Sequence, residues 1–322
     1  MTWKEEIIRL SSIDIEDHTF RITTEENTES LTGSIIDTGL INQPIVIRKK
    51  SGYVVISGFR RIRSVQKLGW SDLTARVLDT KTAPIECAKI AVTDNLTQRP
   101  LNLIEKSRAY KLLSGFLDNK QDLLKTASIL GLPDNQLLVE KTIKLCEMPF
   151  AIQNAIISNT VSLVIALELG KLEYDAGIAI AVLFDKLKPG FNKQKEILTL
   201  FYEIASREGV PILELLNGDE LQSILSDNEP DRNRIINILR QYLKKRRYPL
   251  ITKTENVFER NVKKLALERG MKIIPPANFE GNTFVLSLEF KKIRDLEMQK
   301  EFLDKLIKNQ TLEQIISKST DI

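Results

Sequence analysis

Hydrophobic positions in the first 116 residues change spacing several times. Apolar residues three to four positions apart indicate helices, whereas β-branched runs bounded by glycine indicate strands. The pattern predicts a helix ending at Gly39, a β-hairpin, a helix that starts after Gly58, one more strand and two further helices. These elements cover residues 26–38, 44–57, 59–68, 73–77, 83–93 and 104–116, after an extended segment at 13–22. Residues 1–116 are therefore expected to form an α+β domain.

Helical spacing continues from residue 117 to residue 228. Within it, two short helices at 123–130 and 135–145 flank Gly131, with Ala127 at a small position and Leu137 at an apolar one. This arrangement is typical of a helix-turn-helix, but any helical hairpin shows the same spacing, and both interpretations stay open. Further helices are expected at 162–169, 176–187, 194–207 and 212–225.

A polar segment at residues 226–231 separates this helical stretch from the C-terminal part. Basic helices follow, then a turn at Gly281 and Asn282 and a strand at 283–290 whose alternate residues are apolar. An amphipathic helix at 294–317 is expected to close the chain. The sequence thus predicts an α+β domain at 1–116, a mostly α-helical domain at 117–228, and a small α/β region at 229–322 that is a candidate for dimerisation.

The composition is that of a folded protein. Of the 322 residues, 42% are hydrophobic and 28% charged, a balance that disfavours a disordered chain. The two cysteines, Cys87 and Cys146, and the single histidine, His18, are too few for a zinc cluster or a histidine-based catalytic triad. Since no segment is apolar enough for a signal peptide or a membrane span, we expect a cytoplasmic protein.

The charge is distributed unevenly. The net charge is only +4, yet residues 232–272 hold 13 Lys and Arg against three Glu. A basic block of this kind favours a polyanion partner such as DNA, or it forms a solvated helical face whose last cations cap a helix C-terminus. The candidate DNA-binding residues of this block are Lys244, Lys245, Arg246 and Arg247.

Three arginines, Arg60, Arg61 and Arg63, fall in the first turn of the helix that follows Gly58. Cations at this end oppose the helix dipole, so a negative group is expected to compensate. A phosphate fits, because backbone N–H groups, the dipole and the guanidinium groups then all face one anion. The alternative is structural: Arg60 and Arg63 are solvated and Arg61 pairs with a carboxylate such as Asp94.

Three separated motifs then occur in an order that one protein family shares. They are residues 39–48, residues 58–63, and Asp94-Asn95-Leu96 leading to residues 101–105 and Arg108-Ala109-Tyr110. In content, order and spacing they resemble the N-terminal domain of ParB/RepB-type partition proteins, most strongly over residues 33–112. The C-terminal third, notably residues 247–250 and 275–281, looks like that of the RepB plasmid-partition subgroup.

The resemblance implies a domain that binds CTP with Mg²⁺ and acts as a clamp, loading at a centromere-like site, closing on DNA and opening after hydrolysis. It also implies a homodimer on double-stranded DNA, a ParA-type ATPase partner, and association with a nucleoid or plasmid. It assigns the metal-binding carboxylate to Asp94. It assigns nucleotide binding to Gly39, Gln43, Pro44, Ile45, Gly58, Arg60, Arg61, Arg63 and Asn95.

The sequence departs from the family pattern at two places. The residue after Gly58 is usually acidic and is implicated in hydrolysis, but here it is Phe59, which can neither orient water nor hold a cation. Asp94 stands where the family usually has glutamate, and Gln98-Arg99 lies one residue later than the corresponding pair. We therefore expect nucleotide binding with weak or absent CTP hydrolysis.

The second helix of the predicted helix-turn-helix has few side chains that could read DNA. Its candidates for DNA binding are Asn135, Gln136, Lys141 and Lys144. Because the rest of this helix is apolar or acidic, it is either a weak recognition helix or a helix packed in the core.

Two other functions remain open. The first is a nuclease on the same fold, which would need a metal held by Asp94 with help from Asp79 or Glu105. The second is a non-enzymatic regulator or adaptor that binds DNA or protein and whose nucleotide site has lost its chemistry at Phe59.

Overall fold

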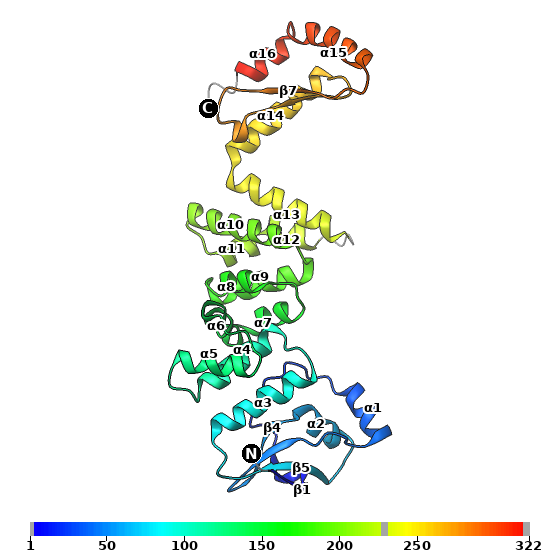
Figure 1. Ribbon diagram of the computed structural model, residues 1–322. Coiled ribbons are helices and arrows are strands. Elements are labelled where there is room, and N and C mark those ends of the chain that lie inside the picture. The colour runs from blue at the N-terminus through cyan, green and yellow to red at the C-terminus, as the bar shows by residue number, and fades with distance from the viewer. Residues whose placement is uncertain (1–2, 227–230, 318–322) are drawn as a thin grey trace. The chain divides into compact units, whose positions relative to one another are not determined.

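The computed structural model describes residues 3–226 and 231–317 (Figure 1). The chain forms two compact units, Met1–Gln194 and Lys195–Ile322. The first unit holds a β-sheet with its helices and a following helical region, and the second holds further helices and a small hairpin. Within the described residues, no helix is both long enough and apolar enough to cross a membrane.

A mixed five-stranded sheet organises the N-terminal part, in the strand order β1-β5-β3-β4-β2. β1 runs antiparallel to β5 and β3 runs antiparallel to β4, whereas β3 with β5 and β2 with β4 are parallel pairs. The β3–β4 pair is the hairpin that the sequence predicts. The strands are β1 (Trp3–Arg9), β2 (Ile13–Asp14), β3 (Ile45–Lys49), β4 (Gly52–Ser57) and β5 (Asp72–Leu78).

Side chains alternate between the two faces of this sheet and build two cores, as the period of a strand requires. On one face, Val46 and Val55 pack with Ile62 of α2. On the other face, Ile47 and Ile56 pack with residues of α3 and α4. The covering helices are α1 (Glu29–Thr38), α2 (Phe59–Lys67), α3 (Pro84–Gln98) and α4 (Leu103–Ser114).

The helical region of the first unit begins with two short helices joined by a turn. Ala127 of α5, Leu132 of the turn and Val139 of α6 are buried together, and Gly131 has a φ of 78°. Leu137, expected at an apolar contact, is instead 66% exposed, because Val139 fills that position. The helices are α5 (Lys120–Ile129), α6 (Gln136–Thr142), α7 (Phe150–Ile157), α8 (Leu163–Leu169) and α9 (Tyr174–Leu187), and α10 (Phe191–Glu208) leads into the second unit.

The second unit is helical apart from the hairpin of β6 and β7, which is antiparallel. Leu265, Leu306 and Ile315 form the centre of its C-terminal core. Its helices are α11 (Ile212–Asn217), α12 (Asp219–Ser226), α13 (Arg232–Arg247), α14 (Pro249–Leu265), α15 (Ile293–Leu306) and α16 (Gln310–Ser317). Its strands are β6 (Met271–Ile274) and β7 (Val285–Leu288).

The predicted fold class, an α+β domain followed by helices and a small α/β region, is confirmed, with three local differences. β1 is a strand that the sequence pattern did not reveal, and α3 continues through residues 94–98, where a loop was expected. The closing helix predicted at 294–317 is two helices, α15 and α16. Most of the boundary predicted at residues 226–231 lies outside the described residues.

Candidate functional site

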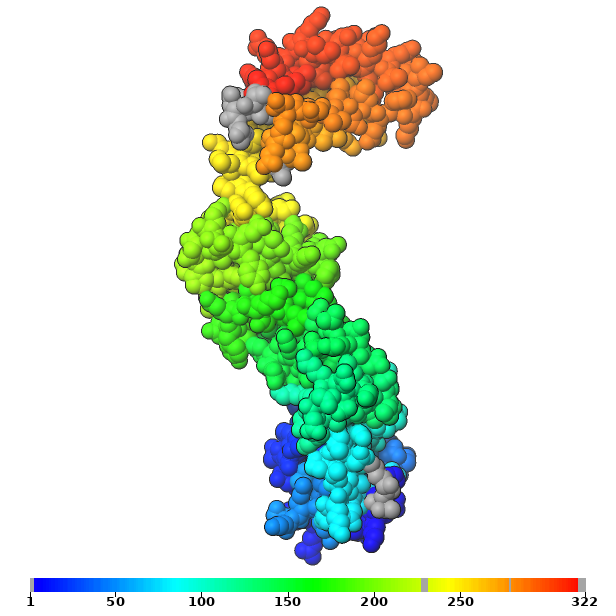
Figure 2. All heavy atoms as spheres, turned by 60° about the vertical axis from the view of Figure 1, so that its left-hand side comes forward, coloured from blue at the N-terminus to red at the C-terminus, as the bar shows by residue number. Residues whose placement is uncertain are grey.

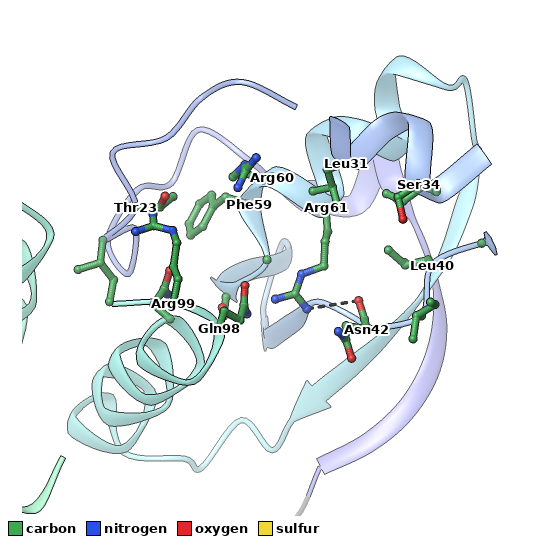
Figure 3. A pocket seen from close by; sticks show the side chains of 17 residues that line it. Thr23, Leu31, Ser34, Leu40, Asn42, Phe59, Arg60, Arg61, Gln98 and Arg99 are labelled. Carbon is green, nitrogen blue, oxygen red and sulfur yellow. Dashed lines mark hydrogen bonds between the residues drawn. The ribbon is translucent and has the colours of Figure 1, made fainter. Parts of the chain in front are cut away.

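A cavity of about 300 Å³ lies beside the start of α2 (Figure 3). Four segments surround it: residues 22–23, helix α1 with the loop after it, the β4–α2 junction, and the end of α3. Its polar lining comes chiefly from Thr23, Ser34, Asn42, Ser57, Arg60, Arg61, Asn95, Gln98 and Arg99. Segments far apart in the sequence therefore meet around one polar cavity.

Gly58 lets the chain turn from β4 into α2 at the wall of this cavity. Its φ of 98° is in the region that favours glycine, and a Cβ on it would lie 2.8 Å from the Cβ of Pro44. The first N–H groups of α2 have no partner within the helix, and the dipole makes this end positive. The junction therefore offers backbone donors to an anion.

Arg61 is held rigidly at this junction. Its Nη1 donates to the carbonyls of Asn42, at 3.3 Å, and Gln43, at 2.9 Å, and Figure 3 shows the bond to Asn42. Its Nη2 donates to Oδ2 of Asp94 at 3.0 Å. The ion pair that the sequence allowed as an alternative is thus confirmed, and the same bonds keep Arg61 in the cavity wall.

Arg60 is attached more loosely. Its guanidinium donates to the carbonyl of Asn27 at 2.7 and 3.1 Å and lies 3.3 Å from Oε1 of Glu25. Because Glu25 is partly exposed, this pair contributes little to stability, and Arg60 can change partner at low cost.

Asp94 is not among the residues that line the cavity, but its carboxylate bonds to three that are. Its Oδ2 accepts hydrogen bonds from Ser57 Oγ, from Arg61 and, at 2.9 Å, from Gln98 Nε2. Among the residues that the structure describes, no group of three or more His, Cys, Asp or Glu could hold a metal. A single carboxylate with one oxygen outside these bonds fits only a cation that arrives with most of its other ligands, as Mg²⁺ does on phosphates.

Arg99 connects the cavity to a buried carboxylate. Its Nη1 and Nη2 donate to the two oxygens of Glu105 at 2.7 and 2.6 Å, and Glu105 is fully buried. Burial alone would raise the pKa of Glu105, but hydrogen bonds from Arg99 and from the backbone N–H groups of Thr24 and Asn102 more than offset it and lower that pKa. Glu105 is therefore ionised and fixes the segment around Thr24.

The structure brings only part of the predicted nucleotide set to the cavity. Lining residues from that set are Gly39, Gly58, Arg60, Arg61 and Asn95. Outside the lining lie Gln43, Pro44, Ile45 and Arg63, as does Asp94. Gln98 and Arg99 line the cavity although they were not assigned to it. Their likeness to the Gln-Arg pair of the family pattern, despite the shift of one residue, is the signal that could have identified them.

Phe59 is buried in the core beneath α2 and borders the cavity. Its ring meets that of His18 edge to face, with ring centroids 6.1 Å apart. The structure adds no observation in favour of a nuclease, because Glu105 is bound to Arg99 and Asp79 caps an exposed turn through Lys81 N.

The outer face of α6 is exposed, so this helix is not enclosed in the core. The Asn135 side chain caps α6 by accepting a hydrogen bond from Leu138 N at 3.0 Å. Gln136 donates to Glu140 at 3.1 Å, and Glu140 also pairs with Lys120. Among the residues that the structure describes, Lys141 in α6 and Lys144 just after it are therefore the two of these four candidates whose side chains form no such bond.

Most of the basic block at the end of α13 packs against carboxylates of α10. Three ion pairs, Lys244–Glu196, Arg246–Glu208 and Arg247–Glu203, join the two helices at 2.9, 2.6 and 2.8 Å. Hydrogen bonds to Glu208 raise the pKa of Arg246 above its ordinary value. These three cations thus join α13 to α10 within the second unit, an arrangement that differs from both the DNA contact and the solvated, helix-capping face that the sequence left open.

Other cations of α13 and α14 are not used in such ion pairs. A cavity of about 740 Å³ lies among α12, α13 and α14, and its lining includes Lys245, Lys253 and Arg260. All three are exposed and form no ion pair among residues 3–226 and 231–317. In Figure 2 these two basic helices, α13 and α14, are the yellow part of the chain.

The N-terminal domain thus combines a mixed sheet with an arginine-rich helix that starts at a left-handed glycine and faces the polar end of α3. The sequence model described as the ParB N-terminal domain matches residues 3–96. A nucleoid occlusion protein of Oceanobacillus iheyensis is 34% identical over 199 residues, which are 60% of this chain and 67% of that protein. The chain belongs to the ParB family.

Further relatives match over a smaller share of their length. The nucleoid occlusion protein of Bacillus licheniformis is 34% identical over 167 residues, 50% of this chain and 56% of that protein. Among solved structures, truncated Caulobacter crescentus ParB in complex with CTP-γ-S is 20% identical, covers 56% of this chain and 98% of that chain, and has a TM-score of 0.26. This score is too low to support an inference about the present site.

Proposed function

We propose that this protein binds DNA in chromosome or plasmid partition, or in nucleoid occlusion, and that the cavity at the start of α2 binds a nucleoside triphosphate, CTP by the family resemblance. The observation that carries the proposal is the convergence of the α2 N-terminus, Arg60, Arg61 and Arg99 on one hollow. Three guanidinium groups beside free backbone N–H groups suit a triphosphate. ParB-family membership supports the same assignment.

Each arginine has a different part in the proposed binding. Arg61 is already fixed by two carbonyls and Asp94 and supplies a preformed donor. Arg60 can leave its partly exposed partner Glu25 and turn to a phosphate. Arg99 is tied to Glu105 but is itself 37% exposed, so one edge of its guanidinium can reach the ligand.

The base is proposed to lie toward Gly39 and the segment Gln43–Ile45, whose backbone runs from the cavity into β3. A bound Mg²⁺ would offset phosphate charge, with Asp94 as its one protein carboxylate. Since Phe59 offers no carboxylate beside the phosphates, we propose that the nucleotide is bound with slow or no hydrolysis.

The DNA contact is proposed to involve two surfaces. One is the exposed face of α6 with Lys141, together with Lys144 just after that helix. The other is the set of unpaired cations Lys245, Lys253 and Arg260, which can neutralise backbone phosphates. A homodimer formed through the C-terminal region and a ParA-type ATPase partner complete the proposal.

The nucleotide part is tested by calorimetric titration of the full chain with CTP, ATP and GTP in the presence of Mg²⁺. The variant is Arg60→Gln, and the matched control is Arg48→Gln, an exposed arginine of β3 that pairs with Glu6. We expect binding to fall at least about tenfold in Arg60→Gln, because a charge-assisted hydrogen bond contributes roughly 1.5–3 kcal/mol, and to be unchanged in the control. Equal affinity in the two variants would contradict the phosphate role of Arg60.

A further inference from the structure

A second cavity, of about 580 Å³, lies in the first unit between the segment 18–26 and helices α4 and α7. It shares no lining residue with the first cavity, although one segment borders both. Ile22 and Thr23 line the first cavity, whereas Arg21 and Thr24 line the second. The two cavities are therefore neighbouring but separate sites.

The second cavity is rich in cations. Its charged lining residues are Arg21, Glu26, Arg108 and Lys111. Of these, Glu26 is the one carboxylate, and it lies at the rim with its side chain 71% exposed. Lys111 pairs with Glu147, and both of these side chains are exposed, so this pair adds little and leaves Lys111 able to change partner.

The two arginines are incompletely satisfied. The Arg21 side chain is only 11% exposed and pairs with Glu26 at 2.9 Å, yet its Nε is shielded from solvent and has no hydrogen-bond partner. Arg108 uses Nη1 to donate to the carbonyl of Thr23 at 2.9 Å. Burial and the neighbouring Arg21 lower the pKa of Arg108. An anion between the two guanidinium groups would relieve their repulsion and supply acceptors.

The remaining wall suits an apolar or aromatic group. Leu112, Phe150 and Ile157 line it, and the Phe150 side chain is 72% exposed. Asn154 adds a side-chain amide from α7, whereas the Gln153 Nε2 group donates to the carbonyls of Cys146 and Met148. The volume falls in the range of roughly 300–1,000 Å³ that is usual for small-molecule sites.

We propose that this cavity binds a small phosphate-bearing molecule, with its phosphate between Arg21 and Arg108 and its apolar or aromatic part against Phe150. A phosphate fits better than a single carboxylate, because it presents acceptors to both arginines and to Lys111 at once. The site is independent of the proposed nucleotide cavity and does not need that function to be correct.

Calorimetry with AMP and with inorganic phosphate on the full chain tests the proposal. Both probes are expected to bind the wild type and to bind Arg108→Gln at least about tenfold more weakly, as the loss of a charge-assisted bond predicts. Phe150→Ala, a change at an exposed side chain, is expected to weaken AMP and leave inorganic phosphate unaffected.

Arg48→Gln serves as the control, because Arg48 lines neither cavity, and it should leave the binding of both probes unaffected. Circular dichroism melting checks that Arg108→Gln is folded, and Lys111→Gln gives a second, exposed variant that should also weaken both probes. The proposal is overturned if neither probe binds at millimolar concentration. It is equally overturned if binding is unchanged in both Arg108→Gln and Lys111→Gln, or is lost in Arg60→Gln alone, which would place the probe in the first cavity.

Discussion

Replacing Glu105 with glutamine is expected to destabilise the N-terminal domain by about 3 kcal/mol. One carboxylate oxygen accepts from Thr24 N and Arg99 Nη2, and the other accepts from Asn102 N and Arg99 Nη1. Whichever way the glutamine amide is turned, its NH₂ group faces one backbone N–H and one guanidinium N–H. Each orientation therefore leaves a buried backbone donor without an acceptor.

The magnitude follows from these contacts. An unsatisfied buried donor costs roughly 1–3 kcal/mol, and breaking a buried ion pair costs roughly 3–5 kcal/mol. The lower end applies, because Arg99 is 37% exposed and water can hydrate it once Glu105 is neutral. The expected loss in the free energy of unfolding is therefore about 3 kcal/mol, well above the loss expected when a surface carboxylate is replaced.

The difference between wild type and Glu105→Gln also depends on pH in a defined direction. The folded state lowers the pKa of Glu105, so its contribution is complete above the unfolded pKa of about 4.3. It is lost as the pH falls through the lower, folded pKa. The two proteins should thus differ fully at pH 7 and progressively less toward strongly acid pH.

Urea unfolding followed by tryptophan fluorescence measures this effect, because the two tryptophans, Trp3 and Trp70, both belong to the sheet domain. The control is Glu86→Gln, a partly exposed residue that pairs with Lys89 within α3 and should change stability by less than about 0.5 kcal/mol. The reasoning would be refuted if Glu105→Gln lost no more unfolding free energy than the control at pH 7. It would also be refuted if the difference in unfolding free energy between wild type and Glu105→Gln grew on acidification.

Two further predictions concern the backbone and the proposed DNA-binding surface. Gly58→Ala should lower the free energy of unfolding by more than about 1 kcal/mol, because φ at this position is positive and the added Cβ would meet a neighbouring side chain. In the control Gly33→Ala, in α1, the added Cβ meets no atom within 4 Å, so this change should be neutral or stabilising. Equal urea midpoints for the two variants would contradict this prediction. The double variant Lys245→Gln and Lys253→Gln should lower the slope of log affinity for DNA against log salt by about two. Lys244→Gln, whose cation pairs with a carboxylate in α10, should leave that slope unchanged, and the opposite ranking would show that the paired cations contact DNA.

Local patterns in the sequence were sufficient for much of the N-terminal domain. The β3–β4 hairpin and α2 were predictable because β-branched runs, glycines and three-residue apolar spacing coincide there. β1 was not predictable, because in this exposed strand only Ile8 is buried and no alternation appears. The extension of α3 was missed because Asp94 and Asn95 have low helix propensity, which their contacts to Arg61 and the preceding turn outweigh.

The candidate site shows the same division between local and long-range information. The arginine cluster after Gly58 and its partner Asp94 could be identified from the sequence, since both lie in recognisable motifs. The pairing of Arg246 with Glu208 could not, because the two residues are far apart in sequence and only the packing of α13 on α10 brings them together. For the same reason, nothing in the sequence indicated that Arg21 and Arg108 would share a cavity.

The central claim is that a nucleoside triphosphate occupies the cavity at the start of α2. Amide hydrogen exchange with and without saturating CTP and Mg²⁺ tests this claim most directly, because it locates the ligand on the chain. We predict added protection in the first turn of α2, residues 59–63, and at the end of α3, residues 95–99, with none in α13 and α14. Protection absent from both cavity segments at saturating nucleotide would contradict the account.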